Sequence, residues 1–229
     1  MTVALFFSSF SVIQNTNLAF SEDYDQLLEF KKWGQTHEIF LVGINKSSKT
    51  LAMDGYDPIT DEILLNDVPN VLIAAELLYT IPDKVLESMK GKTFYFSTEN
   101  GRGLALISSH YRSIENMNDG MIIEQNINPH SVIHEVGHSL DFDKYYDNYQ
   151  NHSIKNSLFE VVLDEQNYLD LPDGYVSYYS LTDSVENFAE HLAFYVVSGD
   201  EFREMAQNDV LLEKKYNFLK NYVFDEIEY

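Results

Sequence analysis

Apolar and polar positions divide this chain into a mixed first part and a helical second part. Up to residue 128, helical periodicity alternates with short apolar runs bounded by glycine and proline. The helices predicted in this part span 23–33, 69–79 and 82–91, and the strands span 38–44, 93–96, 104–107 and 121–123. Beyond residue 128, apolar residues recur at helical spacing, including a helix predicted over 154–163, and a tyrosine-rich loop spans 169–180. The pattern predicts an α+β fold, with a small mixed sheet followed by a helical C-terminal half.

Composition narrows the classes of protein that fit this pattern. A chain of 229 residues with 45% hydrophobic content can bury a core, and residues 22–229 are predicted to form a single domain. The net charge of −22 argues against a nucleic-acid partner, because phosphate contacts need clustered cations. That charge could favour basic substrates, or it could serve solubility alone. Cysteine is absent, so histidine and carboxylate would have to hold any metal. No apolar stretch reaches the ~20 residues of a membrane span, so we expect no membrane-spanning helix.

The first 21 residues follow a different pattern from the rest. Apolar residues dominate positions 3–13, and Ala19 and Ser21 are small residues that suit the cleavage site of a secretory signal. The basic start of such a signal is missing, since the first cation of the chain is Lys31. We expect residues 1–21 to be a truncated signal and the protein to be secreted by a bacterial type of export. An unusual N-terminal strand or helix is the alternative.

The segment Val132–Asp141, with the sequence VIHEVGHSLD, carries the chemistry. On a helix, His134 and His138 lie one turn apart on the same face, so both imidazoles can point to one metal ion. Two such imidazoles supply half of a tetrahedral zinc site, and Glu135 lies where it can act on a water at the metal. Taken alone, an HExxH pattern also fits a buried helix that carries these residues by chance.

A catalytic zinc site needs a third protein ligand. Residues 139–149 contain no histidine, which leaves the carboxylates of a later helix, where Glu186 and Glu190 lie one turn apart. Two alternatives stay open at this point. Asp183 and Glu186 are spaced as a capping box, in which Glu186 would only satisfy a backbone N–H. His191 is a rival ligand, although it points about 100° around the helix from Glu190.

These segments resemble the catalytic domain of the anthrax lethal factor-like metallopeptidases, a family that includes secreted Pro-Pro endopeptidases. The resemblance rests on HEVGHSLD and on ENFAE, whose first glutamate lies 48 residues after His138, with Tyr179 seven residues before that glutamate. It covers residues 70–225 and implies a zincin-like catalytic domain. One departure is Asn187, where the family often has an aromatic residue. Another is His130, one turn before His134, which we interpret as a surface residue at the helix N-terminus because no glutamate adjoins it.

The resemblance implies one zinc ion per chain with the protein ligands His134, His138 and Glu186. Glu135 would then be the general base, and Tyr179 would donate a hydrogen bond to the transition state. These roles predict a zinc-dependent endopeptidase of the gluzincin type (HExxH plus glutamate) that acts on protein or peptide substrates. The alternatives are a catalytically inactive toxin or binding module that retains the fold, and a protein in which the zinc is structural.

Two further carboxylates, Asp141 and Glu190, are candidates for holding a ligand imidazole by its second nitrogen. An extended substrate could pair with an edge of the sheet, for which the candidates are Gly103, Leu104 and Ala105. The sequence does not predict the cleavage specificity or the oligomeric state.

Overall fold

The computed structural model describes residues 25–44, 68–100, 104–106, 120–125, 129–141, 149–161 and 170–229. The expected signal segment over 1–21 and the substrate-binding candidate Gly103 lie outside these residues. Within the described parts of the chain, no helix is both long enough and apolar enough to cross a membrane.

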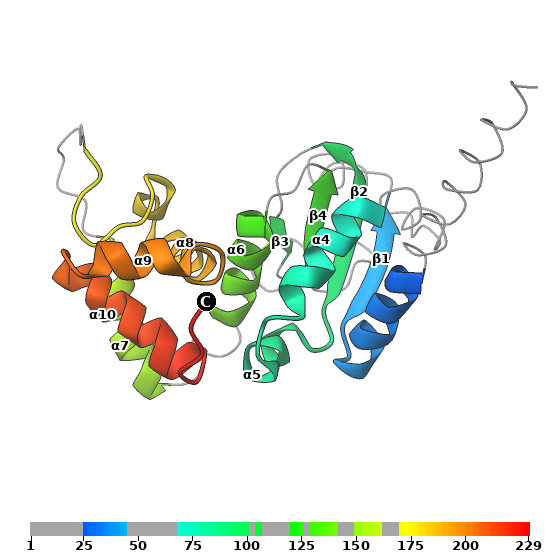
Figure 1. Cartoon of the computed structure of the whole chain (residues 1–229), viewed down its shortest axis with the longest axis horizontal. Helices are drawn as coiled ribbons and strands as arrows, with labels where there is room; N and C mark the ends of the chain where they lie inside the picture. Colours follow the sequence, from blue (N-terminus) through cyan, green and yellow to red (C-terminus); the bar gives the residue numbers. More distant parts are fainter. Residues whose placement is uncertain are drawn as a thin grey trace, which may run out of the picture.

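A small mixed sheet forms the first part of the fold, as the sequence predicted (Figure 1). Its strands are β1 (Phe40–Ile44), β2 (Thr93–Asn100), β3 (Leu104–Leu106) and β4 (Gly120–Gln125), in the spatial order β1-β2-β4-β3. β2 runs parallel to both β1 and β4, and β3 pairs antiparallel with β4. Phe94, Tyr95 and Phe96 are all buried, so both faces of the central strand are covered.

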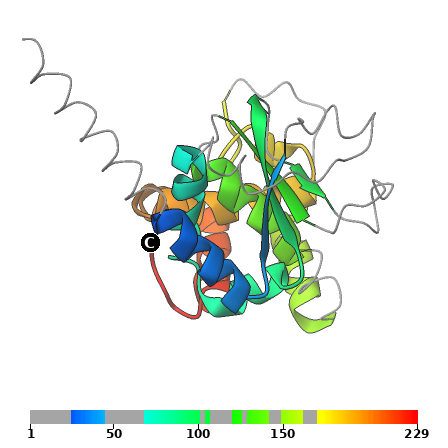
Figure 2. The same cartoon turned by 90° about the vertical axis from the view of Figure 1, so that its right-hand side faces the viewer.

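Helices make up most of the rest of the described chain. The first covers residues 25–36, and its Phe30 packs edge-on against Phe96 of β2, which places it beside the sheet (Figure 2). The later helices are α4 (Val68–Leu78), α5 (Asp83–Leu86), α6 (Pro129–Leu140), α7 (Tyr149–Phe159), α8 (Ser184–Val197), α9 (Gly199–Ala206) and α10 (Val210–Phe218). Shorter turns are η1 (Glu87–Met89), η3 (Tyr179–Leu181) and the π-turn η4 (Leu219–Val223).

Two predicted helices differ from the observed ones. The helix expected over 82–91 is one turn of α5 followed by the 3-10 turn η1. The helix expected over 154–163 is α7, which begins at Tyr149 and ends at Phe159. The carbonyl of Phe159 accepts a hydrogen bond of 2.9 Å from the side chain of Asn187. Packing against α8 therefore ends α7 earlier than its own periodicity suggests.

Helix α6 lies between the sheet part and the helical part of the molecule (Figure 1). It packs against α8 on one side and against α4, β3, β4 and η1 on the other. Every residue from Val132 to Asp141 is buried, and the core of the protein runs through this helix from the sheet to the C-terminal helices. The HEVGH segment is thus held on the most enclosed element of the fold.

Candidate metal centre

The ligands predicted on α6 face helix α8. His134 and His138 are 7% and 9% exposed and Glu135 is 6% exposed, so all three side chains are largely shielded from water. The two imidazole rings have centroids 4.6 Å apart and are nearly perpendicular, as two rings converging on one point can be. Helix α6 therefore presents the pair in the way that its spacing of four residues predicts.

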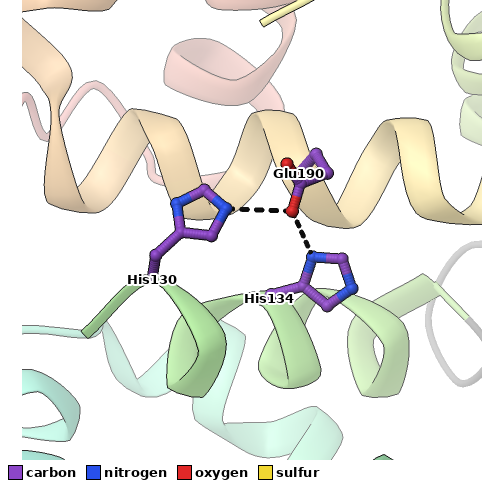
Figure 3. A group of neighbouring side chains, drawn as sticks. All are labelled: His130, His134 and Glu190. Carbon is purple, nitrogen blue, oxygen red and sulfur yellow. Dashed lines mark hydrogen bonds and ion pairs between the residues drawn. The ribbon is translucent and has the colours of Figure 1, made fainter. Parts of the chain in front are cut away.

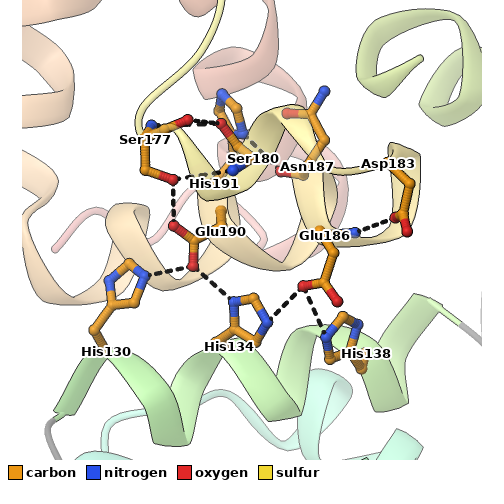
Figure 4. A network of polar contacts seen from close by, with 10 residues as sticks. All are labelled: His130, His134, His138, Ser177, Ser180, Asp183, Glu186, Asn187, Glu190 and His191. Carbon is orange, nitrogen blue, oxygen red and sulfur yellow. Dashed lines mark hydrogen bonds and ion pairs between the residues drawn. The ribbon is translucent and has the colours of Figure 1, made fainter. Parts of the chain in front are cut away.

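Helix α8 brings a carboxylate to this pair. Its N-cap Asp183 accepts hydrogen bonds of 2.9 Å from the backbone N–H groups of Val185 and Glu186. The carboxylate of Glu186 itself points toward α6, where its Oε2 lies 2.9 Å from His134 Nε2 and 3.3 Å from His138 Nε2 (Figure 4). The backbone N–H of Glu186 thus takes part in the helix cap, whereas its carboxylate lies beside the two histidines.

A glycine allows the two helices to approach this closely. A Cβ atom at Gly137 would lie 2.9 Å from Cα and 3.2 Å from Cβ of Ala189 on α8, closer than side chains pack. Because Gly137 lies between the two histidines and Ala189 lies between the two glutamates, this close contact of α6 with α8 is at the site. Small residues here bring the carboxylates within reach of the imidazoles.

The donor atoms of His134, His138 and Glu186 suit a zinc ion. Each offers one ligand atom, and these atoms lie within 4.8 Å of one another. Glu186 Oε2 is buried and, among the described residues, has no hydrogen-bond partner of acceptable geometry despite its short distances to both histidines. Two imidazole nitrogens and one carboxylate oxygen that converge in this way are donors that zinc takes in proteins.

Glu190 holds the other nitrogen of His134. Its Oε1 lies 2.8 Å from His134 Nδ1 and 2.9 Å from His130 Nε2, both with hydrogen-bond geometry (Figure 3). Its Oε2 accepts a hydrogen bond of 2.5 Å from Ser177 Oγ. A carboxylate that accepts from the second nitrogen of a metal-binding imidazole fixes both its tautomer and its orientation.

A second cluster of possible ligands, His130, His134 and Glu190, shares His134 with the first. In that cluster both contacts are hydrogen bonds, and both carboxylate oxygens of Glu190 are already engaged. In the first cluster, Glu186 Oε2 faces both imidazoles without a hydrogen bond of acceptable geometry to either. The geometry therefore favours His134, His138 and Glu186 as the metal-binding set, with Glu190 as a hydrogen-bond acceptor behind it.

Sequence comparison bears directly on this site. The family model described as “Putative zinc-binding metallo-peptidase” matches residues 42–228 of the chain. The chain belongs to this family. The matched region includes both α6 and α8, and with the His and Glu cluster it supports a zinc peptidase acting on protein or peptide. No curated protein matches the chain in a sequence search.

Burial and mutual contacts change the pKa values of His134 and Glu186 in this metallo-peptidase site. Burial by itself lowers the pKa of His134, but its contacts with Glu186 and Glu190 outweigh this and raise the pKa to about 9. Burial raises the pKa of Glu186, but the imidazoles of His134 and His138 lower it to about 2. Glu186 is therefore ionised at neutral pH, in the state that a metal ligand requires.

Tyr179 lies at the open side of the same cluster. It is the first residue of η3, is 50% exposed, and its ring centroid is 5.7 Å from that of His134. Burial of the hydroxyl and the negative charge of Glu186 raise the pKa of Tyr179 to about 12. The charge of Glu135 also raises the pKa of both Tyr179 and His134, which places its carboxylate near both. The phenol therefore stays protonated and able to donate a hydrogen bond.

The other predicted site residues lie in different surroundings. Both oxygens of Asp141 lie 2.5 Å from Lys155 Nζ in a buried ion pair. His138 Nδ1 has no hydrogen-bond partner among the described residues, so Asp141 does not hold it. Leu104 and Ala105 form β3, the end strand of the described sheet, which packs beside α6.

Sequence reasoning missed two residues of this network. His130 was interpreted as a surface residue, but its ring contacts Glu190 because α8 packs over the first turn of α6. Its spacing of four residues from His134 was a signal that it shares the same face. Ser177 is also part of the network, and no pattern in the sequence indicates its contact with Glu190.

Proposed function

We propose that this chain is a zinc endopeptidase of the gluzincin type, in which His134, His138 and Glu186 bind one zinc ion and Glu135 activates the attacking water. The observation that carries the proposal is the convergence of His134 Nε2, His138 Nε2 and Glu186 Oε2 at one enclosed point. Membership of a zinc-binding metallo-peptidase family supports it.

Each residue has a distinct part in the proposed reaction. A zinc ion bound by this set would act as a Lewis acid and lower the pKa of its water to about 7. Glu135 accepts a proton from the attacking water and later delivers it to the leaving amine. Tyr179, whose pKa is raised to about 12, donates a hydrogen bond to the substrate oxygen as negative charge develops on it. Glu190 keeps the ring of His134 in place.

An extended peptide would pair with the sheet edge at Leu104 and Ala105 of β3. The support for this is that β3 is the end strand of the described sheet and packs against α6, which carries Glu135. A peptide added to that edge would run along the metal site, with main-chain hydrogen bonds giving affinity. Gly103 is kept in this proposal on sequence grounds alone.

Two finer assignments rest on the sequence. We propose that, within the family, the chain is of the lethal factor-like kind, on the strength of ENFAE and of Tyr179 seven residues before its first glutamate. We also propose that it is exported, on the strength of the apolar run over 3–13 and the small residues Ala19 and Ser21. Isolation of the protein from culture medium with residues 1–21 removed would support export.

The decisive experiment compares wild type with Glu135→Gln. Metal analysis is combined with digestion of a proteome-derived peptide library, which also reports the cleavage preference. We expect one zinc per chain in both proteins, and cleavage reduced by ~10²–10⁴ in the variant, the range that general acid–base catalysis contributes. Glu213→Gln, an exposed glutamate on α10, is the matched control and should cleave like wild type.

The outcomes separate the alternatives. Zinc binding with cleavage that does not depend on Glu135 would refute the proposed mechanism. Zinc binding with no cleavage at all would favour the inactive binding module. A protein that binds no zinc would refute the metal centre itself.

A further inference from the structure

The backbone N–H and carbonyl of Gly174 are both held by side chains of helix α10 and its N-cap. Its N–H donates a hydrogen bond of 2.5 Å to Asp209 Oδ2, and its carbonyl oxygen accepts one of 2.5 Å from Lys215 Nζ. His191 Nε2 of α8 lies 3.2 Å from the same oxygen. We call this set, Gly174 with Asp209, Lys215 and His191, the Gly174 anchor. It lies at the start of the loop that carries Tyr179, and none of its four residues is a proposed metal ligand.

Backbone conformation and close packing limit which residues can stand at positions 174 and 215 of this anchor. Gly174 has φ +86°, a left-handed conformation that favours glycine, and a Cβ there would lie 2.9 Å from Leu211 Cβ. Lys215 is 4% exposed, and its ammonium also lies 3.1 Å from Asn187 Oδ1 and 4.6 Å from the ring centroid of Tyr175. Burying a cation costs free energy, so an apolar residue would be the simpler choice if Lys215 only filled space.

A short, well-packed path joins the anchor to Tyr179. Val176 is buried at 9% exposure, and Ser177 Oγ donates to Glu190 Oε2. Ser180 Oγ then donates a hydrogen bond of 2.6 Å to the carbonyl of Ser177, closing the turn on which Tyr179 lies. The loop is therefore held twice, by α10 at Gly174 and by α8 at Ser177.

We propose that the Gly174 anchor positions Tyr179 for the peptidase reaction, with Asp209 and Lys215 fixing the loop that presents the Tyr179 hydroxyl to the metal centre. The inference rests on the proposed function, because it assigns positioning residues for that reaction. Asp209 acts through the loop that runs from Gly174 to Tyr179. Lys215 also contacts Asn187, the residue after Glu186 on α8, so Asp209 is the residue that tests the anchor. A misplacement of about 1 Å at a reacting group costs up to ~10²-fold in rate.

Asp209→Asn tests the anchor with little damage elsewhere. Asp209 Oδ1 caps α10 by accepting from the N–H groups of Leu211 and Leu212, at 2.8 and 3.1 Å. Asparagine caps helices equally well, but its amide nitrogen would then face the N–H of Gly174, and two donors cannot bond. Asp209→Ser is a second variant, since serine also caps helices and is too short to reach Gly174. Asp200→Asn, an aspartate with a 97% exposed side chain, is the matched control.

The readout is kcat and KM for a cleaved peptide, measured with and without Tyr179→Phe. We expect Asp209→Asn to lower kcat about 10-fold in the wild-type background, with KM and zinc content nearly unchanged. In the Tyr179→Phe background the same change should lower kcat less than about 2-fold, because the group being positioned is gone. An equal loss in both backgrounds, or no loss in a folded variant, overturns the proposal. Asp200→Asn should leave kcat unchanged.

Hydrogen–deuterium exchange gives a second readout that does not depend on activity. We expect the amides of residues 174–182 to exchange faster in Asp209→Asn and Asp209→Ser than in wild type, while those of α6 are unchanged. Unchanged exchange over 174–182 overturns the proposal even if the enzyme is active. If wild type shows no Glu135-dependent cleavage, the proposed function fails, and the exchange result still decides whether the anchor holds the loop.

Discussion

Glu190 illustrates at the scale of one residue how the site is held. One of its oxygens accepts from His130 and His134, and the other accepts from Ser177. Burial raises the pKa of this carboxyl, but the hydrogen bonds from these three residues lower it far more, so Glu190 is ionised at neutral pH. A single carboxylate thus orients a metal ligand and restrains the loop of Tyr179.

Replacing Glu190 by Gln should therefore weaken metal binding. The amide can still accept from His134, but it lacks the charge that makes the imidazole a better ligand. We expect zinc affinity to fall ~10–100-fold, the usual effect of losing such a partner. Competition with a chromogenic chelator measures it, with Glu213→Gln as the control. An affinity equal to that of wild type would show that Glu190 does not support the ligand.

The two overlapping clusters can be told apart by which histidine is needed to bind zinc, His138 or His130. If zinc is bound by His134, His138 and Glu186, then His138→Ala should lose the bound zinc, because one of three protein ligands is gone. His130→Ala should keep one zinc per chain. Metal analysis after dialysis against a weak chelator distinguishes them. Loss of zinc in His130→Ala with retention in His138→Ala would assign the metal to the other cluster.

The lowered pKa of Lys215 should make the free energy of unfolding depend on pH. Burial lowers the pKa of its ammonium to about 7 from an ordinary value of 10.5, against the opposing attraction of Asp209. Between these values the unfolded chain binds more protons than the folded protein, so the free energy of unfolding should rise with pH. That contribution is fully present above about pH 10.5 and is lost as the pH falls through about 7. Urea unfolding at several pH values should show this rise.

The variant Lys215→Met isolates this effect. Its free energy of unfolding should increase less steeply between about pH 7 and pH 10.5 than that of wild type. Lys214→Met changes an exposed lysine of the same helix and should keep the wild-type slope. Equal slopes in Lys215→Met and wild type would contradict the assignment.

At the scale of elements, the site depends on how closely α6 and α8 pack. The ligands come from both helices, and Gly137 of α6 lies in close contact with Ala189 of α8. Gly137→Ala adds a methyl group into this contact while improving the helix propensity of α6 by ~1 kcal/mol. Overpacking typically costs ~1–3 kcal/mol, so a net loss of stability is expected.

The same variant should weaken metal binding, because separation of the helices moves Glu186 away from the histidines. Denaturant unfolding and chelator competition measure the two effects on one protein. A stability loss with normal zinc affinity would mean that the helices separate elsewhere than at the site. If both quantities were unchanged, the contact at Gly137 would not limit the approach of α8.

At the scale of the whole molecule, the C-terminal segment ties the helical part to the rest. Tyr195 Oη donates a hydrogen bond of 2.6 Å to the carbonyl of Ile227, and Arg203 Nη1 donates one of 2.8 Å to the carbonyl of Tyr229. Tyr229 Oη in turn donates to the carbonyl of Thr80, which follows α4 in the sheet part. The segment packs between α8, α9 and the turn after α4, so it should contribute to global stability.

Tyr195→Phe tests this contribution with the smallest change. It removes the hydroxyl that binds Ile227 and keeps the ring, which stacks on Phe224 with centroids 4.9 Å apart. We expect a loss of about 1 kcal/mol, equivalent to a fall in Tm of ~2–4 °C for a chain of this size. Tyr79→Phe, at a tyrosine that is 48% exposed, is the control. An unchanged Tm would show that the segment adds little.

The sequence predicted the fold class and most helices because these follow from local periodicity. Apolar spacing identified α4, α6 and α8, and short apolar runs identified the strands. The strand order β1-β2-β4-β3 and the parallel pairing of β2 were not predictable, since they depend on long-range contacts. The split of the helix predicted over 82–91 was also missed, because it depends on packing.

For the site, the sequence alone determined that His134, Glu135 and His138 lie together on one helix, because the 3.6-residue repeat fixes that geometry. Helical periodicity left open which carboxylate joins them, and only the resemblance to a known family implied Glu186. Only the tertiary structure placed Glu186 at both histidines, gave Glu190 to His130 and His134, and paired Asp141 with Lys155. The physical reason is that residues on different elements meet only where the elements pack, and packing is set by the whole core.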